Sequence, residues 1–325
     1  MRRAGRNGFA ALAMLALSAP ASAQNTAPKP PPPQTTINNV LANRNAPDTA
    51  FGAYQRGFYV TAFTEATRLA QQSDPAAMTL LGELYANGLG VGRDDAKAAQ
   101  WYKQAAGYGD REAIFALAMF AFEGRAGQRS GAEAARLMTE AARLGHPAAN
   151  YNLALLYLQG QEFKQDFVRA AELLRVAADA GNAEAQYALA TMYKEGRGVA
   201  QDSKQATLLM ARASIAGNLD AMVEFAIAQF NGDGIEKDES AAAQTFLRAA
   251  RRGSAVAQNR LARILMAGRG LPADATEAIR WHLIAKQAGA GDPELDVFAS
   301  RQPQAVRDAA DKAVQKWLTS NLAPR

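Results

Sequence analysis

The sequence predicts an all-α protein: a right-handed α/α solenoid of six 36-residue helix-turn-helix repeats with N- and C-terminal capping helices. Two glycine series recur in steps of 36 residues, and apolar residues between them are spaced three and four apart, as on helices. The two series are Gly88, Gly124, Gly160, Gly196, Gly232 and Gly268, and Gly109, Gly145, Gly181, Gly217, Gly253 and Gly289. Repetition at this period is typical of stacked helical units, which build a surface more readily than a catalytic cleft.

Each repeat is expected to hold two helices, which we call helix A and helix B. In the first copy, helix A runs from about Asp74 to Tyr85, a turn begins at Gly88, and helix B runs from Asp94 to Gly109. Glycine directly after a helix suits the left-handed backbone of many C-terminal caps. Two columns of small residues let neighbouring helices approach closely. They are Ala98, Ala134, Ala170, Ala206, Ala242 and Ala278, and Ala105, Ala141, Ala177, Ala213, Ala249 and Ala285.

Polar residues stand in register at both helix starts, where backbone N–H groups lack helical partners. Side chains that accept from these groups act as N-caps, and each is expected to stabilise its helix by about 1 kcal/mol. The residues before helix B are Asp94, Ser130, Asp166, Asp202, Asp238 and Asp274. Those before helix A are Asp110, His146, Asn182, Asn218 and Ser254.

The repeat unit resembles the Sel1-like repeat, a relative of the tetratricopeptide repeat. The resemblance is clearest in the first copy, at residues 81–85 (LGELY), 88–91 (GLGV) and 97–106 (KAAQWYKQAA). The second and third copies depart from it in the turn, with GRAG at 124–127 and QEF at 161–163. Six copies in phase make the resemblance strong. It implies a curved α-solenoid that binds other proteins.

The parts of the chain outside the six repeats, which occupy residues 73–289, have distinct compositions. Residues 1–23 have basic, apolar and small-residue regions in the order of a secretory signal peptide, with a cleavage site at Ala21-Ser22-Ala23. We therefore expect export, to the periplasm rather than the medium, and no transmembrane span in the mature protein. Residues 24–48 form a Pro-rich disordered linker, which could also be a ligand for a partner, and 49–72 an irregular N-terminal helical repeat. Residues 290–325 are expected to form C-terminal capping helices.

The charge balance argues against nucleic acid and anionic membranes as partners. The chain has 36 Lys and Arg against 31 Asp and Glu, and removal of three arginines with residues 1–23 leaves 33 against 31. Because the sequence has no cysteine, disulfides, thiol catalysis and cysteine metal sites are excluded.

The search for catalytic, metal or cofactor residues finds none. By register, His146 is a helix cap and His282 lies on the buried face of helix B, with no carboxylate nearby that would suggest a triad or a metal site. The Gly-x-Gly turns connect helix to helix and are not phosphate loops. The acidic residues Asp94-Asp95 and 236–239 read as caps and solvated loops rather than acid pairs or calcium ligands.

Candidate partner-binding residues come from the resemblance, because the exposed side of helix A lines the concave face in tetratricopeptide-like stacks. The register carries that face onto Phe115, Met119, Tyr151, Leu155, Tyr187, Thr191, Lys194, Glu195, Phe230, Asn259 and Arg263. For Tyr151, Leu155 and Tyr187 the alternative is packing within the repeat, since the family pattern has similar residues there. For Lys194, Glu195 and Arg263 we expect no packing role.

The functional hypothesis is an exported, non-enzymatic scaffold or regulator of an envelope protein, which binds a partner segment on the helix A face. Two alternatives stay open. Cysteine-rich relatives have been associated with penicillin binding and β-lactamase-like activity, although this chain lacks cysteines and a supported Ser-x-x-Lys motif. A peptidoglycan-associated structural protein is the other.

Overall fold

The computed structural model describes residues 49–160 and 162–322, and all regular secondary structure in these ranges is α-helix. The expected signal peptide and Pro-rich linker lie outside the described residues. The chain divides into two compact units, one ending at Asp166 and the other beginning at Phe167. The division falls between helix A and helix B of the third repeat, just after the turn that departs from the Gly-x-Gly pattern.

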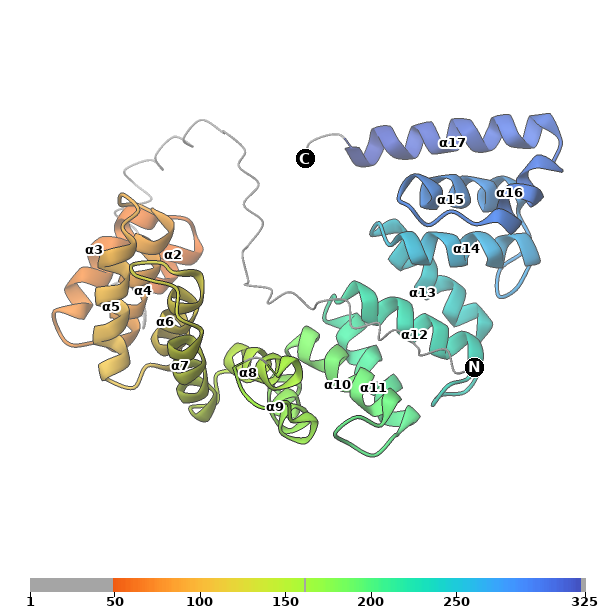
Figure 1. Cartoon of the computed structure of the whole chain (residues 1–325). Coiled ribbons are helices and arrows are strands. Elements are labelled where there is room, and N and C mark those ends of the chain that lie inside the picture. Colours follow the sequence, from red (N-terminus) through yellow and green to blue (C-terminus); the bar gives the residue numbers. More distant parts are fainter. Residues whose placement is uncertain (1–48, 161, 323–325) are drawn as a thin grey trace. The chain divides into compact units, whose positions relative to one another are not determined.

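The first unit is a run of helices in which each packs against the next along the chain (Figure 1). Its helices are α2 (Thr49–Gln55), α3 (Tyr59–Ala70), α4 (Pro75–Asn87), α5 (Asp95–Gly107), α6 (Arg111–Glu123), α7 (Gly131–Arg143) and α8 (Pro147–Gln159). Helices α4, α6 and α8 are the helix A elements of the first three repeats, and α5 and α7 are helix B elements.

The second unit continues the same pattern and adds two helices after the last repeat. Its helices are α9 (Phe167–Asp179), α10 (Ala183–Glu195), α11 (Ser203–Ile215), α12 (Leu219–Asn231), α13 (Glu239–Arg251), α14 (Ala255–Ala267), α15 (Ala275–Gln287), α16 (Pro293–Ser300) and α17 (Gln304–Leu322). Neighbouring helices pack together from α9 to α15, and α17 packs against α15. Here α10, α12 and α14 are helix A elements. Because consecutive helix pairs pack together along each unit, the α-solenoid expected from the sequence is confirmed.

The caps explain why helices α4 to α15 all have the same length of 13 residues. Ten of the eleven predicted cap residues accept a hydrogen bond from a backbone N–H of the following helix, as Asp94 does from Lys97 at 2.9 Å. At Asp166 the cap stays a prediction. Helix A ends at a left-handed glycine such as Gly88, with φ +67°. The N-cap side chain and the C-terminal glycine thus set where a helix begins and ends through contacts within the helix itself.

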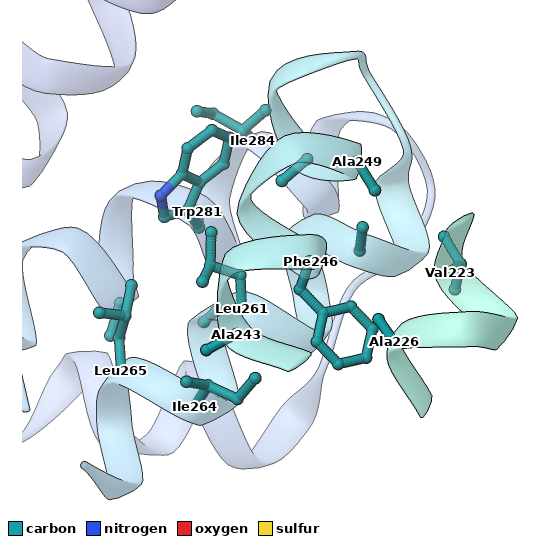
Figure 2. Packing of buried hydrophobic residues seen from close by; sticks show 14 of the residues in the cluster. Val223, Ala226, Ala243, Phe246, Ala249, Leu261, Ile264, Leu265, Trp281 and Ile284 are labelled. Carbon is teal, nitrogen blue, oxygen red and sulfur yellow. The ribbon is translucent and has the colours of Figure 1, made fainter. Parts of the chain in front are cut away.

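The core is made by the alanine columns and the larger side chains beside them. Every member of both columns is buried, with at most 4% of its surface exposed, so the predicted close approach of helices is confirmed. In the second unit, the Phe246 ring of α13 points toward Ala226 of α12, and Leu261 and Ile264 of α14 lie in the same cluster (Figure 2). This cluster continues through Trp281 of α15 to Val314 of α17.

The second glycine of the Gly-x-Gly turn is required by the approach of two backbones. Gly270 has φ +76°, and a Cβ added there would overlap the carbonyl of Glu239, the first residue of the preceding helix B. Gly198 meets the carbonyl of Phe167 in the same way. At Gly198 and Gly270 the turn of one repeat therefore touches the helix B start of the repeat before it, and a side chain would not fit there.

Candidate protein-binding surface

A depression with a volume of about 340 Å³ lies between the helix A elements of the fifth and sixth repeats. Its floor includes the buried side chains of Phe246 and Ile264, which belong to the core, and its walls include Ile227, Phe230 and Met266, which are half-buried. We call it the α12–α14 depression. The full lining is Ile227, Phe230, Asn231, Phe246, Arg260, Arg263, Ile264, Met266, Ala267 and Arg269.

Three arginines and no acidic residue belong to the described lining of this depression. Arg263 is held by Asp292, whose Oδ2 lies 2.6 Å from its Nε, and by Glu294, whose Oε2 lies 2.9 Å from its Nη1. These two carboxylates come from the segment that begins α16, so the ion pairs join the sixth repeat to the C-terminal helices.

Asp292 is the most buried carboxylate of this group, with 7% of its side chain exposed. Burial alone would raise its pKa, but the hydrogen bonds from Arg263 and Asn259 outweigh burial and lower the pKa to about 2. Asp292 also caps α16 by accepting from the Glu294 N–H at 3.0 Å. It therefore stays ionised at neutral pH and fixes the position of the Arg263 guanidinium.

Arg269 is fixed in a similar way. Its guanidinium binds Glu239, with Nη2 2.5 Å and Nε 3.2 Å from the two carboxylate oxygens, and lies 4.4 Å from the centre of the Phe230 ring. Hydrogen bonds from Arg269 and Lys237 lower the pKa of Glu239 to about 2. Arg260, in contrast, is exposed and has no hydrogen-bond or ion-pair partner among residues 49–160 and 162–322.

A second, more polar depression of about 240 Å³ lies between α10 and α12 and shares Ile227 with the first. Lys194 of α10 spans it to Glu224 of α12, with 2.7 Å between Nζ and Oε2. Thr207 donates to the carbonyl of Asp233 at 2.7 Å. The two depressions follow successive helix A elements in the second unit.

Three of the seven predicted residues of the second unit line these depressions. Phe230 and Arg263 line the first and Lys194 lines the second. Asn259, one helical turn from Arg263, donates to Asp292 at 3.2 Å. Two predicted residues on α10 are half-buried: Tyr187, whose pKa is raised by burial, and Thr191, which donates to the Tyr187 carbonyl at 3.1 Å.

In the first unit, two of the four predicted residues are out of reach of a partner. Tyr151 is 4% exposed and Leu155 is 2% exposed, within a run of eight consecutive buried residues on α8, 149–156, which agrees with the packing alternative given for them. Phe115 and Met119 on α6 are half-buried, and the Phe115 ring stacks on His146 with 4.3 Å between the ring centres.

Lys194, Glu195 and Arg263, for which no packing role is expected, are each held in an ion pair. Lys194 pairs with Glu224, Glu195 with Arg197 at 3.3 Å, and Arg263 with Asp292 and Glu294. Each pair satisfies a charge that the register alone leaves without a partner.

Both histidines also have a carboxylate partner, which the sequence analysis did not expect. His146 caps α8 as predicted, since its Nδ1 accepts from the Ala149 N–H at 3.1 Å, and its Nε2 lies 2.8 Å from Glu112. His282 is fully buried as predicted, with Nε2 2.8 Å from Asp296 of α16. Both partners come from an adjacent helix pair, beyond the reach of a local pattern. Among the described residues, no group of three or more potential ligands could hold a metal ion.

Sequence reasoning missed Arg260, Met266 and Arg269. A signal for Arg260 was present, because its column holds charged residues only in the last two copies, where Glu224 and Arg260 stand. The earlier members are Leu80, Ala116, Asn152 and Ala188. A column whose residue type varies from copy to copy, as this one does, marks a position that stacking does not determine.

Repeated helix pairs with an alanine core, capped starts and left-handed glycine ends define an α/α repeat protein with a surface rather than an enclosed pocket. The Sel1 repeat model matches residues 75–107, 111–146, 147–182, 183–218, 219–254 and 255–289. The chain belongs to the Sel1 repeat family, whose members are generally scaffolds for protein–protein interaction and typically lack enzymatic activity.

Solved structures that are similar to the chain include the following two. A Sel1 repeat protein from Oxalobacter formigenes is 27% identical with a TM-score of 0.62, over 74% of this chain and 96% of that one. A protective antigen of uropathogenic Escherichia coli strains with an SLR fold is 24% identical with a TM-score of 0.52, over 80% of this chain and 64% of that one. A comparison with curated proteins finds no match. Within the described ranges, no helix has the length and apolar character needed to cross a membrane.

Proposed function

We propose that this protein is a non-enzymatic scaffold of the cell envelope that holds a segment of a partner protein against its helix A face. The observation that carries the proposal is the α12–α14 depression, where two successive repeats supply apolar walls around a core floor. Its volume of about 340 Å³ is at the low end of ligand pockets, which span about 300–1,000 Å³. Such a depression suits the anchoring side chain of a protein segment.

The ion pairs around the depression support a binding role. Asp292, Glu294 and Glu239 hold two of the rim arginines in place, so the rim is organised before a partner arrives. A preformed site loses less conformational entropy on binding than a mobile one. In the first unit, Phe115 and Met119 on α6 are proposed as a further region that contacts the partner.

The envelope location is proposed from the sequence of residues 1–23 alone. Cleavage after Ala23 would release a mature protein that begins at Gln24. Intact-mass measurement of the protein from fractionated cells tests this. The proposal expects the Gln24 form in the envelope fraction, and an uncleaved chain confined to the cytoplasm would contradict it.

The binding face is tested by affinity capture with a matched pair of variants. Phe230→Ala removes a wall of the depression, whereas Leu208→Ala truncates a side chain that is 54% exposed on α11, a helix B element. We expect an envelope protein that is captured by the parent chain and by Leu208→Ala but much less by Phe230→Ala. Equal capture by all three, with unchanged circular dichroism, would contradict the assignment.

A further inference from the structure

We infer that the α12–α14 depression recognises an acidic segment with a large apolar side chain, bound through Arg260. This inference rests on the proposed function and specifies the chemistry of the partner. The described lining combines three guanidinium groups with an apolar floor and contains no carboxylate. A segment that carries both an apolar side chain and a neighbouring Asp or Glu is therefore complementary to it.

The three arginines differ in whether a carboxylate of the protein already binds them. Arg263 and Arg269 are neutralised within the protein, by Asp292 and Glu294 and by Glu239 respectively. Arg260 has no such partner within the described ranges, although it lies one helical turn from Arg263 on the same face of α14. Its guanidinium offers five N–H donors in a geometry that matches a carboxylate.

The apolar part of the depression determines which side chain of the partner can insert. Phe246 and Ile264 close the floor, and Met266 is an adaptable wall that can adjust to side chains of different shape. Arg269 covers one face of the Phe230 ring at 4.4 Å, which keeps that wall in place. We expect Leu, Ile, Met or Phe as the inserted side chain.

The chain's own Pro-rich segment does not have this chemistry. Residues 24–48 carry Lys29 and Arg44 against the single acidic residue Asp48, which gives a net charge of +1. Charge complementarity therefore favours a separate, acidic partner over a self-bound segment.

The experiment is selection of peptides from a phage-displayed library of random 12-residue sequences on the immobilised protein. We expect enriched peptides to carry Asp or Glu within a few residues of a large apolar residue. Their synthetic versions should bind about tenfold more weakly to Arg260→Glu, because attraction becomes repulsion. Arg251→Glu, which makes the same charge change at an exposed residue outside the depression, should leave binding unchanged.

Charge exchange provides the decisive control. A peptide in which Lys replaces the acidic residue should lose affinity for the parent protein and regain it with Arg260→Glu. Enriched peptides without acidic residues, or with equal affinity for the parent and Arg260→Glu, would overturn the inference. Displacement of the peptide by a synthetic segment of residues 24–48 would overturn it as well.

The same peptides distinguish failure of the inference from failure of the proposed function. If binding is lost in Phe230→Ala but is indifferent to Arg260→Glu, the depression binds segments of another chemistry and only the inference fails. If no enriched peptide depends on Phe230 or Met266, the depression is not the binding face and both fail. Circular dichroism of each variant confirms that its fold is retained.

Discussion

At Gly270, the absence of a side chain lets the turn of one repeat touch the backbone of the repeat before it. Gly90, Gly198 and Gly234 stand at the same position of their copies, whereas the second copy has Ala126 and the third has Glu162, which faces a helix that starts at Gly131. A Cβ added at Gly131 would overlap the Glu162 carboxylate. The Gly131 contact thus involves the end of a flexible side chain, whereas the Gly270 contact involves a backbone that cannot move aside as easily.

We predict that Gly270→Ala lowers the free energy of unfolding by about 2–4 kcal/mol, because alanine is strained at φ +76° and its Cβ overlaps the Glu239 backbone. Urea unfolding followed by circular dichroism measures the change. Gly291→Ala is the control, since its added Cβ would lie 3.5 Å from the nearest atom, an ordinary contact, and we expect less than about 0.5 kcal/mol. Equal effects of the two substitutions would contradict the close approach.

Substitution of Arg263 is predicted to lower the stability of the fold, whereas substitution of Arg260 is predicted to affect partner binding and not stability. Arg263→Met leaves the buried Asp292 carboxylate without its cation, so we expect a loss of about 1–3 kcal/mol in unfolding free energy. Within the described ranges, Arg260→Met removes no hydrogen bond or ion pair and is expected to change stability by less than about 0.5 kcal/mol. Thermal unfolding of the two variants at pH 7 tests this. A destabilising Arg260→Met would show that Arg260 has a structural partner.

The ion pair between Arg263 and Asp292 predicts that the stability of the fold depends on pH. The pKa of Asp292 is about 2 in the folded protein, below the 3.8 of an unperturbed aspartate, so its contribution to stability is present above about pH 4. It is lost as pH falls from about 4 to 2, because the unfolded chain binds the proton first. In Arg263→Met the pKa of Asp292 rises, and acid unfolding should begin at higher pH. An unchanged acid transition would contradict the proposed ion pair.

At the scale of elements, arginines in the turns of the second, fourth and sixth repeats join these repeats to helix B of the repeat before. Each guanidinium reaches the first residue of that helix, by an ion pair where the residue is acidic and over the ring where it is phenylalanine. The pairs are Arg125 with Asp95, Arg197 with Phe167, and Arg269 with Glu239. Because these contacts are partly exposed, their role is to set position more than to add stability.

The C-terminal helix α17 covers the last repeat. The Trp317 ring contacts Trp281 edge to face, with 5.1 Å between centres, and Trp281 is 1% exposed. We predict that Trp317→Ala lowers the unfolding free energy by about 2–3 kcal/mol, less than for a fully buried tryptophan because Trp317 is half-buried. Chemical unfolding measures this, with Val297→Ala, 47% exposed on α16, as the control. A loss below about 0.5 kcal/mol for Trp317→Ala would show that α17 is not a cap.

The elements were largely predictable from the sequence because their signals are local and repeated six times. A cap such as Asp238 or a stop such as Gly232 acts within one turn of its own helix. The partners of Arg263 were not predictable, since Asp292 and Glu294 lie beyond the last repeat, where no register applies. Packing of Tyr151 was open to sequence reasoning as an alternative, but its full burial was not distinguishable from the half-buried state of the equivalent Tyr187 in the next copy.

At the scale of the whole molecule, identical construction of the repeats leaves their surface residues free to differ. The polar α10–α12 depression and the arginine-rimmed α12–α14 depression lie on successive copies of one helix. A repeat protein can in this way present a sequence of unlike sites without changing its core. This arrangement supports the proposed binding role of the helix A face in the second unit.

Site-specific photocrosslinking in living cells tests that role most directly. A photoreactive amino acid at Asn231, on the rim of the α12–α14 depression, is compared with one at Leu208, exposed on a helix B element of the same unit. The prediction is a discrete crosslinked protein at position 231 that is absent at 208 and weakened by Arg260→Glu. Crosslinks of equal yield at both positions, or none at 231, would contradict the proposal that this face binds a partner.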